Sequence, residues 1–106
     1  MDEIFQLHAD ICKTFSHAKR LEIINALRDK ELTASQLLHQ IDISKANLSQ
    51  HMAILIQKGV VISRREGINV FYRLSDRRIT KACDLMREVL IGNLKRNNKI
   101  LKSLKR

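Results

Sequence analysis

The chain has 106 residues, of which 44% are hydrophobic, and it carries a formal net charge of +9 with a pI near 10.1. A chain of this size is expected to form one domain, and oligomerisation would hide the apolar side chains that a short chain leaves exposed. Two cysteines exclude a disulfide framework, and no stretch approaches the roughly 18–20 apolar residues of a membrane span. The acidic start lacks the features of a signal peptide, so we expect a cytoplasmic protein with reduced thiols.

The positive charge is concentrated in the later part of the chain. The net charge is −2 over residues 1–43, +4 over residues 44–75 and +7 over residues 76–106. Such an uneven distribution is typical of a surface that binds phosphate groups.

Hydrophobic spacing predicts two helices at the start of the chain. The first covers residues 2–15, where apolar residues three or four positions apart predict one buried stripe. This stripe consists of Ile4, Leu7, Ile11 and Phe15. A second helix is expected over about residues 17–29, with Ser16 as its cap. Its apolar positions are Leu21, Ile23, Ile24, Ala26 and Leu27.

Residues 33–59 have the pattern of a helix-turn-helix. An extended link over residues 30–32 leads to Thr33, which forms a capping box with Gln36 at the start of a short helix. A turn follows, and Ser44 is placed to cap the next helix, which ends at Gly59 in a left-handed conformation. Two short helices joined by such a turn are typical of DNA-binding helix-turn-helix motifs.

The second helix of this motif has an uncharged polar face. At about 100° per residue, its apolar stripe lies opposite a face of amides and small side chains. The stripe contains Leu48, Met52, Leu55 and Ile56, and the opposite face contains Ala46, Asn47, Gln50, Ala53 and Gln57. Because solvated faces are usually rich in Lys and Glu, this face favours a partner that needs hydrogen bonds and close approach. Base edges in a DNA major groove are such a partner.

The remaining chain predicts a hairpin and a long helix. Two β-branched and aromatic runs separated by Glu66 and Gly67 predict a β-hairpin over residues 60–74. The amphipathic segment 76–106 contains no proline and a single glycine, so it could be helical nearly to Arg106, or fray after about Gly92. A heptad seam suited to a dimer can be drawn through Ile79, Cys83, Met86, Leu90, Asn93, Asn97, Ile100 and Leu104. The order of elements predicts a single domain that is mainly α with a β-hairpin wing, a winged helix-turn-helix.

The residue patterns resemble those of the ArsR/SmtB family of transcriptional repressors. The resemblance is carried by FSHAKRLEIINAL at 15–27, ELTASQLLHQIDISKANLSQHMAIL at 31–55 and GVVISRREGINVFYRLSD at 59–76. It implies a homodimer through helices 2–15 and 76–106, with helix 44–59 in the major groove of a short inverted repeat and the wing beside the minor groove or backbone. It also implies a repressor that an inducer, often a metal ion or a thiol-reactive species, releases from its operator.

Several residues are candidates for DNA binding. Lys45, Asn47 and Gln50 are the leading base-edge candidates, because amides can pair with adenine and Lys can reach guanine acceptors. Ala46 could lie against a thymine methyl, and Ser49 suits a phosphate contact, whereas Ser44 is better explained as a cap. His51 lies beside the apolar stripe, which favours packing with a possible phosphate contact. On the wing, phosphate neutralisation is expected from Arg64, Arg65, Asn69 and Arg73, while core or dimer packing is expected from Phe71 and Tyr72.

The candidate sensor residues are Cys12, Cys83 and His8. Residues 33–41 contain no cysteine and residues 76–106 no histidine, so two metal sites common in the resembled family are absent. If helices 2–15 and 76–106 pack together as the family implies, Cys12 and Cys83 could form a disulfide or polysulfide bridge within or between subunits. Related thiol switches, however, place their first cysteine in the second helix. One alternative is that both cysteines are small buried side chains; another is that a thiophilic metal ion binds His8, Cys12 and Cys83, which leaves a zinc shell one ligand short.

Other classes of protein fit less well. We find no glycine loop, C-x-x-C pair or catalytic constellation, so we expect no enzymatic activity and no cofactor. A nonspecific architectural DNA-binding protein remains an alternative, although the amide-rich face argues against it. A membrane-associated or partner-binding adaptor that uses the basic segment 95–106 is a further alternative.

Overall fold

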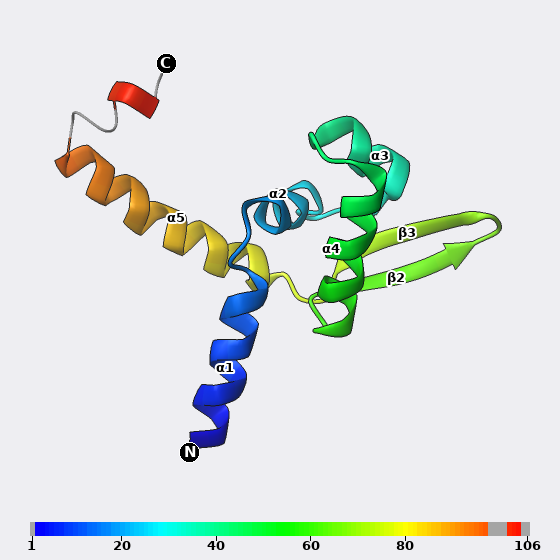
Figure 1. The fold of residues 1–106 in the computed structure, drawn as a ribbon, viewed down its shortest axis with the longest axis horizontal. Coiled ribbons are helices and arrows are strands. Elements are labelled where there is room, and N and C mark those ends of the chain that lie inside the picture. The colour runs from blue at the N-terminus through cyan, green and yellow to red at the C-terminus, as the bar shows by residue number, and fades with distance from the viewer. Residues whose placement is uncertain (1, 98–101, 105–106) are drawn as a thin grey trace.

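The computed structural model describes residues 2–97 and 102–104. Figure 1 shows a central body of helices from which a β-hairpin projects on one side and two helices on the other. The elements in order are α1 (Asp2–Thr14), α2 (Ala18–Ala26), β1 (Leu32–Thr33), α3 (Ala34–Gln40), α4 (Lys45–Gln57), β2 (Val61–Glu66), β3 (Asn69–Leu74) and α5 (Arg78–Arg96). This order confirms the mainly α fold with a β-hairpin wing.

The wing belongs to a three-stranded antiparallel sheet with the strand order β1-β3-β2. Strands β2 and β3 pair from Val61↔Leu74 to Glu66↔Asn69, and Gly67 begins the turn with φ +63°, a value that favours glycine. The short strand β1 pairs Leu32 with Tyr72. The sequence predicted an extended link here but not its pairing, because two residues are too short for a periodic signal.

The core lies where α2, α3, α4 and the base of the sheet meet. Its buried side chains are Ile23, Ile24, Leu27, Leu32, Leu37, Ile41, Leu48, Met52, Leu55, Val60 and Val61. Phe15, Tyr72, Leu74, Ile79 and Cys83 are partly buried against it. The apolar positions predicted for the second helix, together with Leu37 and Ile41 at α3, therefore supply much of the core, and α4 is held by its buried side.

Side-chain caps define the helix-turn-helix, as the sequence predicted. The Thr33 backbone N–H donates to Gln36 Oε1 at 2.8 Å, and the Gln36 N–H donates to Thr33 Oγ1 at 3.2 Å. The Asn47 N–H donates to Ser44 Oγ at 3.1 Å, which opens α4. Gly59 follows the end of α4 with φ +75°, the left-handed conformation expected of it.

The predicted start and length of the second helix were wrong. His17 caps α2, since its Nδ1 accepts from the Lys19 N–H at 3.2 Å. The Ser16 hydroxyl instead donates to the Cys12 carbonyl at 2.8 Å, because the end of α1 leaves carbonyls without helical partners. Helix α2 ends at Ala26 rather than near residue 29, and Asp29 has a left-handed φ of +55°.

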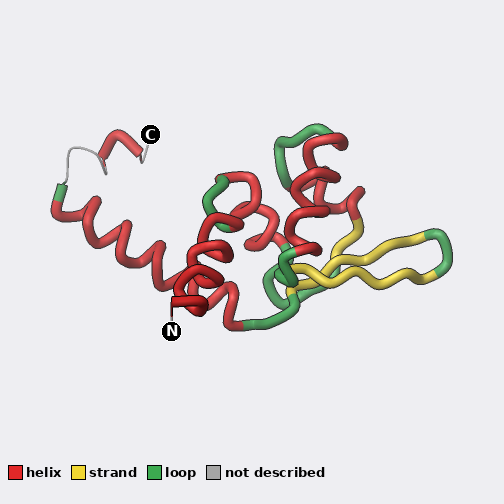
Figure 2. The backbone as a smooth tube through the Cα atoms, turned by 60° about the horizontal axis from the view of Figure 1, so that its bottom comes forward, coloured by secondary structure: helices red, strands yellow, loops and turns green. Residues whose placement is uncertain are grey.

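Helix α5 extends away from the body (Figure 2). Both α1 and α5 leave apolar side chains uncovered. The predicted buried stripe on the first helix is wrong for a single chain, because Ile4 is 57% and Leu7 63% exposed. On α5, Met86 and Leu90 of the predicted seam are 70% and 54% exposed. Nothing else in the described part of one chain packs over these faces.

Helix α5 continues past Gly92 and ends at Arg96, with Asn97 as its C-cap. A continuous helix nearly to Arg106 is therefore not formed, although residues 102–104 make a helical turn. The predictions for residues 98–101 and 105–106 lie outside the described residues. None of the described helices is both long and apolar enough to span a bilayer.

Candidate nucleic-acid interface

Helix α4 is buried on one side and open on the other. Leu48, Met52 and Leu55 are buried in the core. Ile56, predicted to share their stripe, is 39% exposed, because it points toward the wing rather than into the core.

The open side of α4 carries the polar residues singled out in the sequence. Lys45, Ala46, Asn47, Ser49 and Gln50 are all exposed within the first two turns of the helix. Only Lys45 among them is charged. The helix can therefore approach a partner closely and offer amide donors and acceptors to it.

His51 packs inward, as predicted. Its Nδ1 accepts a hydrogen bond from Arg20 Nε at 3.1 Å, and its ring lies 4.4 Å from the His17 ring. Burial, with further contributions from the positive charges of His17 and Arg20, lowers the pKa of His51 below its usual 6.5. His51 therefore braces α4 against the start of α2.

Residues that the sequence did not single out also hold α4 in place. Arg20 NH1 donates to the Thr14 carbonyl at 3.2 Å, so one guanidinium joins the end of α1 to α4. Lys58 Nζ, just after α4, lies 3.0 Å from Asp10 Oδ2 on α1. Such long-range pairs have no local sequence signal, since their partners are brought together only by the fold.

On the wing, Arg64 is engaged within the protein. Its Nε and NH2 donate to the two carboxylate oxygens of Glu31 at 3.2 and 2.9 Å, and its NH1 donates to Glu66 at 2.6 Å. The guanidinium also lies 4.7 Å from the centre of the Phe71 ring. These contacts tie β2 to the segment before β1 and lower the pKa of Glu31. Arg64 is therefore poorly placed to offer its charge to DNA.

The other polar wing residues make fewer contacts within the protein than Arg64 does. Arg65 and Asn69 are exposed, and within the described residues Arg65 has no carboxylate within 4.0 Å. Arg73 is exposed and lies 4.0 Å from Glu31, at the limit of an ion pair. Phe71 and Tyr72 are half-buried. The accessible positive charge on the wing is therefore that of Arg65 and Arg73.

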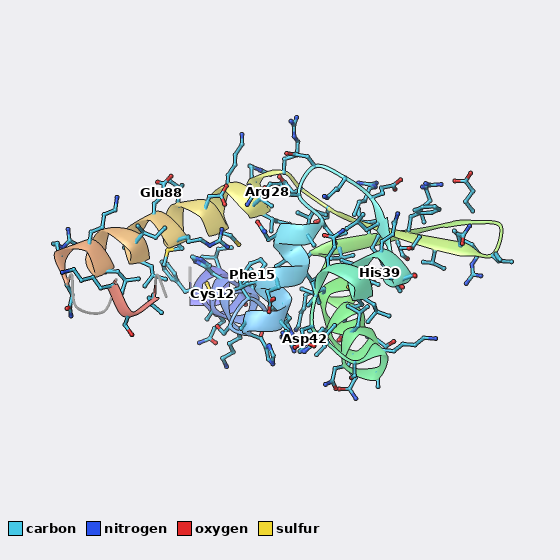
Figure 3. The ribbon with its side chains drawn as sticks, turned by 90° about the horizontal axis from the view of Figure 1, so that it is seen from above. Cys12, Phe15, Arg28, His39, Asp42 and Glu88 are labelled. Carbon is cyan, nitrogen blue, oxygen red and sulfur yellow. The ribbon has the colours of Figure 1, made fainter. Side chains whose placement is uncertain are left out.

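The two cysteines lie in different environments. Cys12, labelled in Figure 3, is exposed on α1. Cys83 is half-buried on α5 against the core, and both are free thiols. The interpretation that both are buried is therefore wrong for Cys12 in a single chain. Burial raises the pKa of the Cys83 thiol, which disfavours its thiolate.

No metal site forms among the candidate sensor residues of one subunit. Within residues 2–97 and 102–104, no three side chains of His, Cys, Asp or Glu are grouped so that they could hold a metal ion. The alternative site of His8, Cys12 and Cys83 is therefore not assembled in a single chain.

A charged pair beside Cys83 joins the turn after α2 to α5. Arg28 NH1 and NH2 donate to the two carboxylate oxygens of Asp84 at 2.8 and 2.7 Å, and Arg87 NH1 donates to the same carboxylate at 3.3 Å. Hydrogen bonding to Arg28 lowers the pKa of Asp84. Bidentate pairing of this kind fixes orientation, so it couples the body to the helix that carries Cys83.

Comparisons with known proteins agree with a DNA-binding helix-turn-helix. The family model described as "Bacterial regulatory protein, arsR family" matches residues 17–63. The transcriptional activator HlyU of Vibrio cholerae is 34% identical over 76 residues, which cover 72% of this chain and 70% of HlyU. The biofilm growth-associated repressor of Xylella fastidiosa is 37% identical over 68 residues, which cover 64% of this chain and 60% of that protein.

A solved structure supports the fold. The homodimeric winged helix-turn-helix DNA-binding domain Mb0332 of Mycobacterium bovis matches with a TM-score of 0.78 and 21% identity, covering 89% of this chain and 87% of that one. The capped helix-turn-helix and the hairpin wing of this chain are consistent with the family that the sequence comparisons indicate. The chain belongs to the arsR family of bacterial regulatory proteins and is a DNA-binding transcriptional regulator.

Proposed function

We propose that this protein is a homodimeric, cytoplasmic repressor, without enzymatic activity, that binds a short inverted repeat in duplex DNA. The observation that carries the proposal is the exposed, amide-rich side of α4 on a helix whose other side is locked into the core. Asn47 and Gln50 are assigned to base edges and Ala46 to a thymine methyl. Repression is supported by the Xylella fastidiosa relative, which is a repressor, although HlyU is an activator.

The backbone contacts are assigned to accessible donors. Ser49 on α4 and Arg65, Asn69 and Arg73 on the wing are exposed, so they can donate to phosphates without breaking an internal hydrogen bond. Ser44, His51 and Arg64, also considered as DNA contacts from the sequence, are assigned instead to capping and bracing.

The dimer is assigned to α1 and α5. Both helices present uncovered apolar side chains, namely Ile4, Phe5 and Leu7 on α1 and Leu85, Met86, Val89, Leu90 and Ile91 on α5. Covering such a surface with a second copy stabilises a short chain that cannot cover it alone. Two copies related by a two-fold axis present two α4 helices, which explains an inverted repeat.

Release from DNA is assigned to the thiols. Cys12 and Cys83 lie on the two helices assigned to the dimer, and Cys83 is next to the Arg28–Asp84 pair that joins α5 to the body. Hydrogen peroxide would oxidise the two thiols to one disulfide, with two molecules of water as the other product. The new bond would change how α1 and α5 pack. The alternative inducer is a thiophilic metal ion bound between subunits by His8, Cys12 and Cys83.

Genome-wide footprinting tests the proposed function. A few short inverted repeats protected by the protein, with transcription of the adjacent genes rising when the protein is removed, is the expected result. A diffuse signal without a shared repeat would favour the architectural alternative instead.

A second experiment tests the inducer. Operator affinity and free thiols are measured together after peroxide or polysulfide treatment and after metal addition, for wild type and for Cys12→Ser and Cys83→Ser. We expect oxidation to weaken operator binding in the wild type only. Unchanged affinity after complete oxidation would rule out the thiol switch without affecting the DNA-binding proposal.

A further inference from the structure

A hollow lies between α4 and the wing. It has a volume of about 260 Å³, and none of the side chains that line it is acidic. Its polar lining consists of Lys45, Ser49 and Tyr72, and its apolar lining includes Leu48, Ala53 and Ile56. Two elements far apart in the sequence thus contribute donors to one small site.

The three polar groups are available to a ligand. In the described part of the chain, no protein group accepts a hydrogen bond from the Lys45 ammonium, the Ser49 hydroxyl or the Tyr72 hydroxyl. Every buried polar side-chain atom among the described residues has a hydrogen-bond partner, so these three unpartnered groups are not buried. The three donors are therefore open to solvent. Tyr72 is held in place by its backbone, which pairs with Ser63 on one side and Leu32 on the other, while its ring packs against the core.

The hollow lies along one edge of the exposed side of α4. At about 100° per residue, Ala46 and Gln50 occupy the middle of that side, and Lys45, Ser49 and Ala53 occupy the edge toward the wing. When a helix lies in a major groove, the middle of its outer face meets base edges and its borders meet the sugar-phosphate backbone. The hollow is thus at the level of the backbone rather than the bases.

The chemistry of the lining matches a backbone unit. A phosphodiester has oxygens that accept from an ammonium and from hydroxyls, and the absence of acidic side chains in the lining avoids repulsion. The deoxyribose next to it has an apolar surface that fits methyl groups such as those of Ala53 and Ile56.

We propose that this hollow binds one phosphodiester of the DNA backbone, with Lys45, Ser49 and Tyr72 donating to its oxygens. The proposal rests on the proposed function and adds a site to it. It assigns Lys45 to the backbone instead of guanine, and it gives Tyr72 a contact beyond packing. Because α4 and the wing would hold the same phosphate, this contact would fix how deeply α4 enters the groove.

Tyr72→Phe is the first test, because it removes one hydroxyl and retains the ring. We expect operator affinity to fall by at least about tenfold, as for loss of one hydrogen bond to a charged group, and Ser49→Ala to behave similarly. Lys45→Met should lower the salt slope of dimer binding by about two, one for each half-site, while leaving discrimination between operator sequences unchanged. Lys81→Met, at an exposed position on α5, is the matched control and should leave affinity unchanged. Thermal unfolding checks that each variant is folded.

The position of the phosphate gives a second readout. Operator duplexes with a single neutral methylphosphonate at successive positions are titrated with wild type and with Tyr72→Phe. We expect one position in each half-site where the substitution weakens wild type but not the variant. Equal affinities of Tyr72→Phe and wild type, or a Lys45→Met variant that loses base discrimination, would overturn the proposal.

Two further outcomes distinguish a site for the DNA backbone from a site for free anions and from a failure of operator recognition. If inorganic phosphate saturates the site in the DNA-free protein, followed by NMR shifts that Tyr72→Phe abolishes, the site belongs to a free anion and the assignment to DNA is overturned. If wild type does not discriminate its operator from other DNA, the proposed function itself fails. If wild type recognises its operator but Tyr72→Phe binds it equally well, only the proposal for the hollow fails.

Discussion

At the scale of single residues, internal contacts separate the side chains that can contact DNA from those that hold the protein together. Arg64 and Arg65 are neighbours on β2, and both are exposed. Arg64 is engaged by Glu31, Glu66 and the Phe71 ring, whereas Arg65 has no carboxylate partner among the described residues. Only the second can neutralise a phosphate without breaking contacts inside the wing.

The residues on α4 and on the wing should differ in the kind of binding that they support. We expect Gln50→Ala to reduce discrimination between operator and altered operator by about 1–3 kcal/mol, because an amide reads one base pair. We expect Arg65→Ala to weaken binding to all DNA similarly and to lower the salt slope of dimer binding by about two, one for each half-site. Binding curves measured at several salt concentrations, with operator and scrambled duplexes of equal length, give the discrimination and the salt slope of each variant. Equal effects of both variants on discrimination would contradict this division.

At the scale of elements, α4 depends on a cap and on a brace. The cap is Ser44, whose hydroxyl accepts from the Asn47 N–H. Ser44→Ala should lower the free energy of unfolding by about 1 kcal/mol, within the range measured for lost N-caps. Ser44→Asp should keep that stability, since aspartate caps equally well, yet weaken DNA binding because it adds negative charge beside phosphates.

Urea unfolding and operator titration of both variants test the role of the cap. Ser35→Ala, at an exposed position in α3, is the control and should change stability by less than about 0.5 kcal/mol. A Ser44→Asp variant as unstable as Ser44→Ala would show that capping is not what Ser44 contributes.

The brace at His51 makes stability depend on pH. Arg20 donates to Nδ1 of His51, so that nitrogen cannot carry a proton while the contact persists, and burial lowers the pKa of His51 below 6.5. Above about pH 7 the side chain is neutral in the folded and the unfolded chain, and its contribution is fully present. As the pH falls through 6.5 the unfolded chain takes up the proton first, so the free energy of unfolding decreases until the folded pKa is passed.

We therefore expect His51→Asn to flatten the pH dependence of stability below about pH 7. Urea unfolding at a series of pH values measures it. His39→Gln removes an exposed histidine from α3 and should keep the wild-type slope. Identical slopes for wild type and His51→Asn would mean that the brace does not couple protonation to folding.

At the scale of the whole molecule, the body buries its apolar side chains, but the two outer helices, α1 and α5, do not bury theirs. The body has a closed core and paired strands, whereas α1 and α5 project from it (Figure 1). Both helices expose apolar faces that no other described part of the chain covers. Leu90→Glu places a charge in the surface assigned to the dimer, where burial of an unpaired carboxylate is costly. We expect it to be monomeric at micromolar concentration and to bind the operator more than about tenfold more weakly.

Sedimentation velocity and operator titration check this expectation. Glu88→Gln, two residues away on α5 and exposed, is the control and should stay a dimer. If Leu90→Glu remained dimeric with normal operator affinity, the dimer would have to use another surface.

Local signals in the sequence determined the helix-turn-helix and the wing. Side-chain caps such as Thr33 with Gln36 and Ser44, glycines at positive φ, and alternation along the hairpin act over a few residues, so their meaning does not depend on the rest of the chain. The polar face of α4 was predictable for the same reason, because helical periodicity alone separates it from the buried side.

Contacts between distant segments were decided only by the tertiary structure. The ion pairs of Arg64 with Glu31 and of Arg28 with Asp84, the His51 brace and the hollow that brings Tyr72 to Lys45 join residues with no common local pattern. Burial also depends on what packs on a face. The apolar spacing of α1 and α5 identified their apolar faces, but only the folded chain showed that Leu7 and Met86 are left uncovered.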